Sequence, residues 1–416
     1  MSNKSRRAFL GTAAGAAAFA GGCSRSVPAV EAQNKTPNPS PKLELLEFQP
    51  KSMLVVPEHP VARARFPVID VHTHIANVFG RKPEAPRAGP GHLHLGQVDP
   101  AVAFKQLDDI VKWNAEINLK TAINLTGGWG DDLKRNVNDL QERYKGHFVN
   151  CVTPAWDKTR EPGYPQWQAD ELANAKKMGA VGLKVAKTLG LYLRENGKDG
   201  PLVKIDDPRF NPMWEAAGAL HLPVFIHTGD PDAFFTPIDR SNERWEELGN
   251  HPDWSFHGKD FPPKSELLAA RNRVIEKHPK TQFVCLHVAN HPENLEEVSG
   301  WLKKYANLHV EIGARLGELG RQPRQARKFF DNFSGRIMFG TDGTPNGEEV
   351  PQQDLVPSMY QAYFRFLETL DEYFDYAPSA TPPQGRWRIY GIGLPEAMLK
   401  NVYHDNAARL LGWKTV

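Results

Sequence analysis

The stretch PVIDVHTHI, residues 67–75, has the composition of a buried β-strand, yet it contains two histidines. Its apolar residues are mostly β-branched, which favours a strand. His72 and His74 are two residues apart, and Asp70 stands two residues before His72. Alternate side chains of a strand share a face, so we expect all three to point inward. Imidazoles in a protein core need polar partners or a metal ion.

Seven further apolar runs follow along the chain, separated by amphipathic patterns that are typical of helices. The clearest helical patterns are residues 102–117, 131–144, 168–179 and 263–279. Eight strands that alternate with helices indicate a parallel sheet, and eight is the number that closes a barrel. We therefore predict an α/β fold, a (β/α)8 TIM barrel. An open doubly wound sheet is the alternative, but no G-x-G-x-x-G follows the first strand. The seven runs are KTAINLT (120–126), FVNCVTPAW (148–156), AVGLKVAK (180–187), LPVFIHTG (222–229), QFVCLHVA (282–289), NLHVEIGA (307–314) and RIMFGTD (336–342).

Three connections are longer than ordinary loops: residues 76–101, 230–262 and 343–386. They follow the first, fifth and eighth strands and hence lie on the C-terminal face, where barrel active sites are built. Long loops in a compact domain usually serve as lids or binding loops. Residues 394–412 are expected to form a closing helix.

The N-terminal segment is expected to be a targeting signal. SRRAFL (5–10) and the short apolar stretch after it resemble a Tat-type export signal over residues 1–32, with Cys23 a candidate lipoprotein site. A disordered basic N-terminus is the alternative. Residues 33–65 are predicted to be a Pro-rich linker, and residues 66–416 the barrel. This organisation predicts an exported protein that is periplasmic or lipid-anchored.

The overall composition restricts the partners. The formal net charge is only +2, which gives no electrostatic case for nucleic acid. The chain has 3 cysteines, too few for a disulfide framework. We expect contact with a membrane only through a lipid anchor, and the sequence leaves oligomerisation open.

Other predicted strands also end in ligand-type residues. The fifth ends in His227, the sixth in His287 and the eighth in Asp342. With His72 and His74, four strand ends offer imidazole or carboxylate to one barrel mouth. Neutral imidazoles and a carboxylate suit Zn²⁺, with Mn²⁺ or Fe²⁺ as alternatives. We therefore expect one divalent metal ion as the cofactor.

The motifs DVHTH, PVFIH, FVCLH and FGTD, in this order, resemble the amidohydrolase superfamily. The similarity covers residues 66–412 and is greatest to the branch that includes aminocarboxymuconate semialdehyde decarboxylase. The resemblance implies that His72, His74, His227 and Asp342 bind the metal ion. It also implies that His287 is the catalytic acid or base, and Asp342 is a further candidate for moving the proton of the water.

Three more residues are candidates around this site. Asp70 is interpreted as a hydrogen-bond acceptor from a ligand histidine, with a buried capping role as the alternative. Lys184 ends the fourth strand. It either binds a substrate carboxylate or pairs with Asp342 or Glu311, or it is, as in other branches of the superfamily, a carbamylated bridge between two metal ions. Arg315 follows the seventh strand and fits a substrate carboxylate, with an ion pair to a glutamate as the alternative.

These residues predict a metal-dependent hydrolase or lyase that uses a metal-bound water or a metal-polarised substrate. We expect a small carboxylated compound as substrate, with hydrolysis of a lactone, ester or amide favoured over decarboxylation. A binuclear amidohydrolase with carbamylated Lys184 is one alternative. A non-catalytic exported barrel that binds a ligand is an alternative of another class. Trp129 and Trp156 are candidates to wall the pocket, unless they only pack at the rim.

Overall fold

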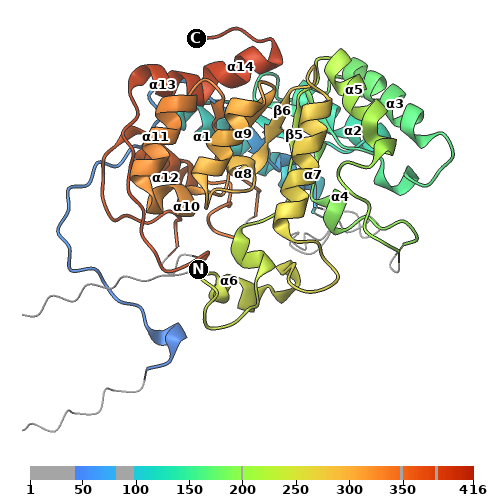
Figure 1. Ribbon diagram of the computed structural model, residues 1–416. Coiled ribbons are helices and arrows are strands. Elements are labelled where there is room, and N and C mark those ends of the chain that lie inside the picture. The colour runs from blue at the N-terminus through green and yellow to red at the C-terminus, as the bar shows by residue number, and fades with distance from the viewer. Residues whose placement is uncertain (1–42, 81–97, 198–199, 347–349, 380–382) are drawn as a thin grey trace, which may run out of the picture. The chain divides into compact units, whose positions relative to one another are not determined.

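The computed structural model describes residues 43–80, 98–197, 200–346, 350–379 and 383–416 (Figure 1). The chain divides into two units, Met1–Ser52 and Met53–Val416. The described part of the first unit contains one 3-10 turn, η1 (Leu45–Glu47). The predicted export signal, Cys23 and residues 81–97 of the first long loop lie outside the described residues. Residues 53–65, predicted as the end of a linker, belong to the same unit as the barrel.

Eight parallel strands form one sheet in the order in which they occur along the chain. The sheet closes on itself, because the Val71 amide donates to the Phe339 carbonyl at 3.1 Å and the Asp342 amide donates to the His72 carbonyl at 2.8 Å. The prediction of a (β/α)8 barrel is therefore confirmed. The strands are β1 (Val68–Thr73), β2 (Leu119–Asn124), β3 (Phe148–Val152), β4 (Gly182–Val185), β5 (Val224–Ile226), β6 (Phe283–Cys285), β7 (Leu308–Glu311) and β8 (Ile337–Met338).

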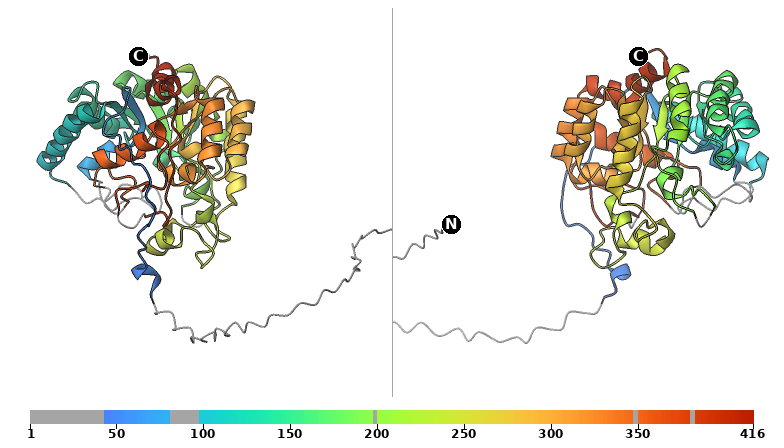
Figure 2. Two further views of the ribbon diagram at one scale, coloured as in Figure 1. Left: turned by 90° about the vertical axis from the view of Figure 1, so that its left-hand side faces the viewer. Right: turned by 45° about the vertical axis from the view of Figure 1, so that its right-hand side comes forward.

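Helices surround the strands on the outside (Figure 2). Helix α1 begins where the Asp99 carboxylate accepts from the Ala101 amide at 2.8 Å, and α3 ends at Gly179, which has a left-handed φ of 111°. The longer helices are α1 (Pro100–Ile117), α3 (Tyr164–Met178), α5 (Asn211–Ala219), α7 (Lys264–Lys277), α9 (Leu295–Lys304), α11 (Pro323–Phe333) and α12 (Pro357–Glu368). The shorter ones are α2 (Gly130–Asn136), α4 (Thr188–Leu191), α6 (Trp245–Asn250), α8 (Leu286–Ala289), α10 (Leu316–Arg321), α13 (Glu396–Lys400) and α14 (Asn406–Leu411).

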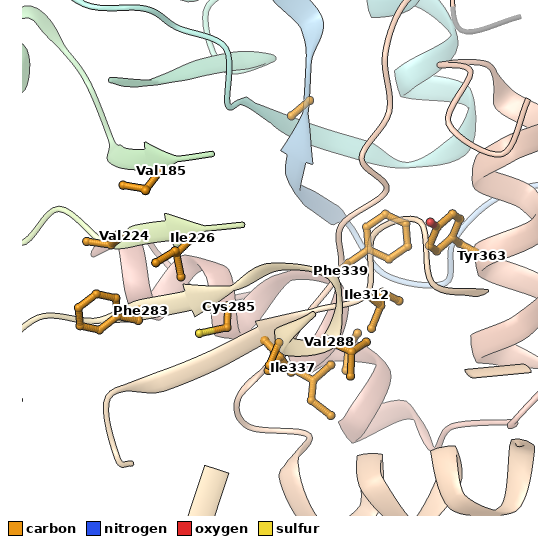
Figure 3. Close-up of a cluster of buried hydrophobic side chains, with 14 of the residues drawn as sticks. Val185, Val224, Ile226, Phe283, Cys285, Val288, Ile312, Ile337, Phe339 and Tyr363 are labelled. Carbon is orange, nitrogen blue, oxygen red and sulfur yellow. The ribbon is translucent and has the colours of Figure 1, made fainter. Parts of the chain in front are cut away.

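The core has two layers because successive strand residues face opposite sides. Val224, Ile226, Phe283 and Cys285 belong to the outer layer, between sheet and helices (Figure 3). The inner layer fills the barrel and is drawn from most of the strands. Its members include Ile69, Val71, Ile123, Cys151, Phe225, Val284, Met338, Ala407 and Ala408. The last two come from α14, which therefore closes one end of the barrel.

The C-terminal face is covered by the long connections. Residues 230–262 contain η6 (Asp232–Phe235), α6 and η7 (Pro252–Trp254), and α6 lies at the end of the barrel opposite α14 (Figure 1). Residues 343–386 are more than a rim loop, because they include α12, whose Tyr360 and Tyr363 pack on Phe339. Within the described ranges, no helix combines the length and the apolar character that crossing a membrane requires.

Candidate metal centre

Three side chains meet at the C-terminal end of the barrel. Donor atoms of His72, His287 and Asp342 all lie within 4.8 Å of one another, and the three residues are buried. They come from the ends of β1, β6 and β8, which are not consecutive in sequence and are joined here by the closure of the barrel. His74 reaches the same point, with its Nε2 atom 2.9 Å from Asp342 Oδ1.

The carboxylate of Asp342 is shared. Its Oδ1 atom accepts from His72 Nε2 at 2.9 Å and from His74 Nε2 at 2.9 Å, and its Oδ2 atom accepts from Gln353 Nε2. Burial by itself raises the pKa of Asp342, but His72 and the bond from His74 outweigh it and hold the pKa well below its usual value. The ionised carboxylate of Asp342 thus accepts hydrogen bonds from the imidazoles of both His72 and His74.

His72 is held between two carboxylates. Its Nδ1 atom is 3.2 Å from Glu311 Oε1, and its Nε2 atom is on Asp342. Burial lowers the pKa of His72, but the charges of Asp342 and Glu311 more than compensate and raise it above its ordinary value. A proton on His72 therefore supplies the positive charge that a metal ion would bring to the same atoms.

Glu311, at the end of β7, was considered from the sequence only as an ion-pair partner of Lys184 or Arg315. It is fully buried and accepts from the His287 amide at 2.6 Å and from the Gly313 amide, as well as from His72. It thus orients one predicted ligand and the predicted acid–base residue. Two glycines make room for its carboxylate: a Cβ atom on Gly340 would lie 2.3 Å, and one on Gly313 2.7 Å, from Glu311 Oε2.

His287 stands on an unusual turn. Residues 287–290 all have positive φ, between 55° and 56°, although none is glycine. The Nδ1–H group donates to the Gly313 carbonyl at 2.8 Å, which leaves the lone pair on Nε2. Nε2 is buried without a hydrogen-bond partner in the described part of the chain and lies 3.9 Å from Asp342 Oδ2. Burial, followed by the charge of Arg315, lowers the pKa of His287 well below its ordinary value.

His227 does not join the cluster of His72, His287 and Asp342. Its ring centroid lies 4.3 Å from that of His287, but its Nε2 atom is 3.2 Å from Asp230 Oδ1. Asp230 also binds Lys187 Nζ at 2.5 Å. Burial lowers the pKa of His227 to about 3, so the ring is neutral and donates to Asp230. The ligand role of His227 stays a prediction, because Nε2 must leave Asp230 to bind an ion.

Lys184 lies inside the barrel mouth. Its Nζ atom is 3.4 Å from His72 Nε2, and its side chain is buried. Burial lowers the pKa of Lys184 to about 8, against the opposing pull of Asp342 and Glu311. The side chain is thus placed to reach the metal centre, as the sequence interpretations of Lys184 require.

Asp70 departs from the predicted inward direction. Ile69 and Val71 belong to the inner core layer, so Asp70 faces outward, and its Oδ2 atom accepts from Thr341 Oγ1 at 2.6 Å and from Tyr360 at 2.8 Å. Its Oδ1 atom accepts from the His72 backbone amide at 3.0 Å, not from an imidazole. The expected acceptor of a ligand histidine is therefore Glu311. The reason is a register shift in the pairing of β1 with β2 between Asp70 and Thr73, which breaks the alternation.

A cavity opens beside the centre, lined by His74, Lys184, His227, His287 and Asp342 among others. Arg315 also lines it and is buried, as the prediction of a substrate contact requires. Trp129 and Trp156 are not among its lining residues. They pack against Trp167 and Phe210, with ring centroids 5.7 Å and 5.9 Å apart. The packing interpretation of these two tryptophans is therefore the right one.

The residues present fit a divalent metal ion. They supply imidazole nitrogens and one ionised carboxylate, the donor set that Zn²⁺, Mn²⁺ and Fe²⁺ accept. The unpartnered Nε2 of His287 gives a further polar atom at the same place. A second group of ligand-type residues, Asp232, His291 and Glu293, differs, because Lys264 Nζ already lies 2.6 Å from Asp232 Oδ1.

Comparison with known proteins identifies one family and several solved structures that have a similar fold but a low sequence identity. The family whose model is described as Amidohydrolase matches residues 69–413. Among curated proteins, no sequence matches this chain.

Three solved structures illustrate the similarity of fold. 2,6-Dihydroxybenzoate decarboxylase from Rhizobium is 14% identical with a TM-score of 0.46, covering 83% of this chain and 99% of that one. 5-Carboxyvanillate decarboxylase from Sphingomonas paucimobilis is 15% identical with a TM-score of 0.45, and the match covers 84% of this chain and 100% of that one. A probable 2-pyrone-4,6-dicarboxylic acid hydrolase from Acinetobacter baumannii is 11% identical with a TM-score of 0.47, and the match covers 83% of this chain and 99% of that one. Likenesses at these levels carry no argument about the reaction.

Proposed function

The chain belongs to the amidohydrolase family, and from this membership we propose that it is a metal-dependent hydrolase or lyase acting on a small carboxylated compound. The observation that carries the proposal is the meeting of His72 and His74 on one oxygen of Asp342, beside the unpartnered Nε2 atom of His287. Hydrolysis of a lactone, ester or amide comes before decarboxylation, because hydrolysis is the common use of such a centre.

In this proposal His72, His74, His227 and Asp342 hold one divalent ion, with Zn²⁺ first and Mn²⁺ or Fe²⁺ as alternatives. The ion supplies Lewis acidity, which activates water and polarises a carbonyl group. Glu311 keeps His72 in place through Nδ1, and Nε2, which here contacts Asp342, is the ring nitrogen that would bind the ion. His227 would join once Nε2 leaves Asp230 and the ring proton resides on Nδ1, which frees the lone pair of Nε2 for the ion.

His287 is the proton carrier. Its Nδ1–H group is fixed by the Gly313 carbonyl, so its Nε2 atom is a lone-pair base that faces the cavity side of the centre. From there it accepts a proton from the attacking water and returns it to the leaving group. Burial and the charge of Arg315 lower the pKa of His287, which favours the unprotonated base.

The deciding experiment is metal analysis of protein purified without chelators, followed by activity on lactones, esters, amides and conjugated acids. We expect about one equivalent of metal per chain. His72→Ala and Asp342→Asn should lose the metal while circular dichroism shows an intact fold. His221→Ala, which changes an exposed histidine after α5, is the matched control.

Other outcomes separate the alternatives. About two equivalents of metal would favour the binuclear enzyme with carbamylated Lys184. No bound metal in a folded protein, with no activity restored by added ions, would favour a non-catalytic ligand-binding barrel and would refute the proposal. Release of CO₂ in place of an acid product would favour the lyase.

We also propose that the protein is exported, on the basis of SRRAFL (5–10) and the apolar stretch that follows it. Fractionation of cells that express the full chain should place it in the periplasm, or in the membrane fraction if Cys23 carries a lipid. Replacement of Arg6 and Arg7 by lysine should retain the protein in the cytoplasm. Unchanged export of that variant would contradict the proposal.

A further inference from the structure

Four side-chain amides line the cavity beside the proposed metal centre, and we call them the amide wall. Asn77, Gln352, Gln353 and Gln384 all line it, together with the hydroxyl-bearing residue Thr344. Binding pockets for small ligands are usually apolar with only a few placed polar groups. An amide offers two donor hydrogens and two acceptor lone pairs, so this wall can form many hydrogen bonds with an occupant.

The protein itself uses only part of this capacity. Gln384 Nε2 reaches the Ala314 carbonyl at 3.4 Å, and Gln352 Nε2 reaches Gln353 Oε1 at 3.4 Å, both at the long end for a hydrogen bond. Gln352 Oε1 is buried with no partner among the described residues. A buried polar atom without a hydrogen-bond partner costs free energy, so a ligand whose hydroxyl groups bond to these amides would be stabilised in the cavity.

Arg315 brings a guanidinium group with an unused hydrogen-bond donor to the same cavity. Its Nη1 atom donates to the Ala314 carbonyl at 2.7 Å, and its Nε atom is buried without a partner in the described part of the chain. The charge of Arg315 acts on Glu247 and Glu318, but the cation that contacts their carboxylates in the described residues is Arg244, at 2.7 Å from Glu247. Arg315 is therefore available to a ligand carboxylate.

An aromatic surface completes the cavity. The Trp254 ring lines it and is stacked on the His251 ring, with centroids 4.0 Å apart and planes at 9°. Phe234 lines it as well. Polar groups on one side and a supported aromatic ring on another suit a molecule that has both hydroxyl groups and C–H faces.

We propose that the substrate is a polyhydroxylated carboxylic acid or a close derivative of one, with a carboxylate at Arg315 and hydroxyl groups on Gln352 and Gln384. This inference rests on the proposed function and names the substrate class of the same site. A planar aromatic acid would bind less well, because its ring would leave the amides without partners.

Binding to the metal-loaded protein tests the inference without assuming the reaction. Calorimetry would compare D-glucarate with adipate, which has the same carbon chain and both carboxylates but no hydroxyl groups, and with phthalate. Two hydrogen bonds between amides and hydroxyls correspond to about 30-fold in affinity, so D-glucarate should bind about 30-fold more tightly than adipate or phthalate.

Variants separate the amide wall from direct chelation of the metal by hydroxyl groups. Gln352→Leu and, independently, Gln384→Leu should each remove one of the two hydrogen bonds and narrow the preference for D-glucarate over adipate from about 30-fold to about fivefold. Gln166→Leu, at an exposed position on α3, is the matched control and should keep it. Arg315→Met should weaken both diacids by about 10-fold to 100-fold, and Arg315→Lys by less.

Equal or tighter binding of adipate or phthalate to metal-loaded protein would overturn the inference and leave the proposed function standing. A preference for D-glucarate that survives both glutamine variants would also overturn it, because chelation would then explain the preference. Protein that holds no metal would instead refute the proposed function. The three results are distinguishable by metal analysis of the same samples.

Discussion

Replacement of Glu311 by glutamine should weaken metal binding although Glu311 is not a proposed ligand. The carboxylate accepts from three N–H groups, those of the His287 amide, the Gly313 amide and His72 Nδ1. Glutamine has one carbonyl oxygen and one NH₂ group. In either orientation its NH₂ group faces at least one of these donors, so at least one buried N–H group loses its partner.

The structure sets the size of the effect. One buried donor without a partner costs about 1–3 kcal/mol. Loss of the group that orients a ligand histidine typically lowers metal affinity by about 10-fold to 100-fold, or about 1.4–2.7 kcal/mol. The first cost should appear as lost stability, and the second predicts a dissociation constant for the metal that rises by about 10-fold to 100-fold in Glu311→Gln.

Competition with a chromophoric chelator at pH 7.5 measures this constant directly. Glu396→Gln, which removes an exposed carboxylate paired with Arg65, is the control and should match the wild type. Urea unfolding of the metal-free proteins reports the structural cost separately. Wild-type affinity, within twofold, in a folded Glu311→Gln variant would show that Glu311 does not act through His72.

Three further predictions concern stability. His221→Gly should raise the free energy of unfolding by about 1 kcal/mol in urea titration, because exposed His221 has a φ of 51° after α5; no gain would contradict this. Burial, and then the charge of Arg336, lowers the pKa of His309 to about 4 in the folded protein. As the pH falls below 6.5, the His309 imidazole is therefore protonated in the unfolded chain before it is protonated in the folded one. Stability should then fall by up to about 3 kcal/mol between pH 6.5 and 4, and His309→Gln should remove that part of the loss. Asp371→Ala should expose the chain near His59 to limited proteolysis, because Asp371 accepts from the His59 amide at 2.7 Å; an unchanged cleavage pattern would count against this.

The sequence was sufficient for the barrel because its strands carry a strong local signal. Runs such as 222–229 and 282–289 are buried on both faces, so their apolar residues are continuous, and the structure places β5 and β6 inside them. The same runs end in His227 and His287, which is why the mouth of the barrel was predictable.

The contacts within the site were less predictable. The direction of Asp70 depends on a register shift against β2, and the partner of His227 depends on how the chain turns to bring Asp230 back. Both are set by tertiary structure, not by residue spacing. Glu311 was visible only as a single charge in an apolar run, and its role follows from three donors that belong to β1, α8 and the residues after β7.

The seam between β1 and β8 has a consequence for biosynthesis. The Asp342 amide binds the His72 carbonyl across it, and the carboxylate of Asp342 gathers the imidazoles of the first strand. A nascent chain still tethered to the ribosome before residue 342 has emerged therefore has the first histidines but not the anion that collects them. The cluster of His72, His287 and Asp342 can therefore assemble only after residue 342 has been synthesised.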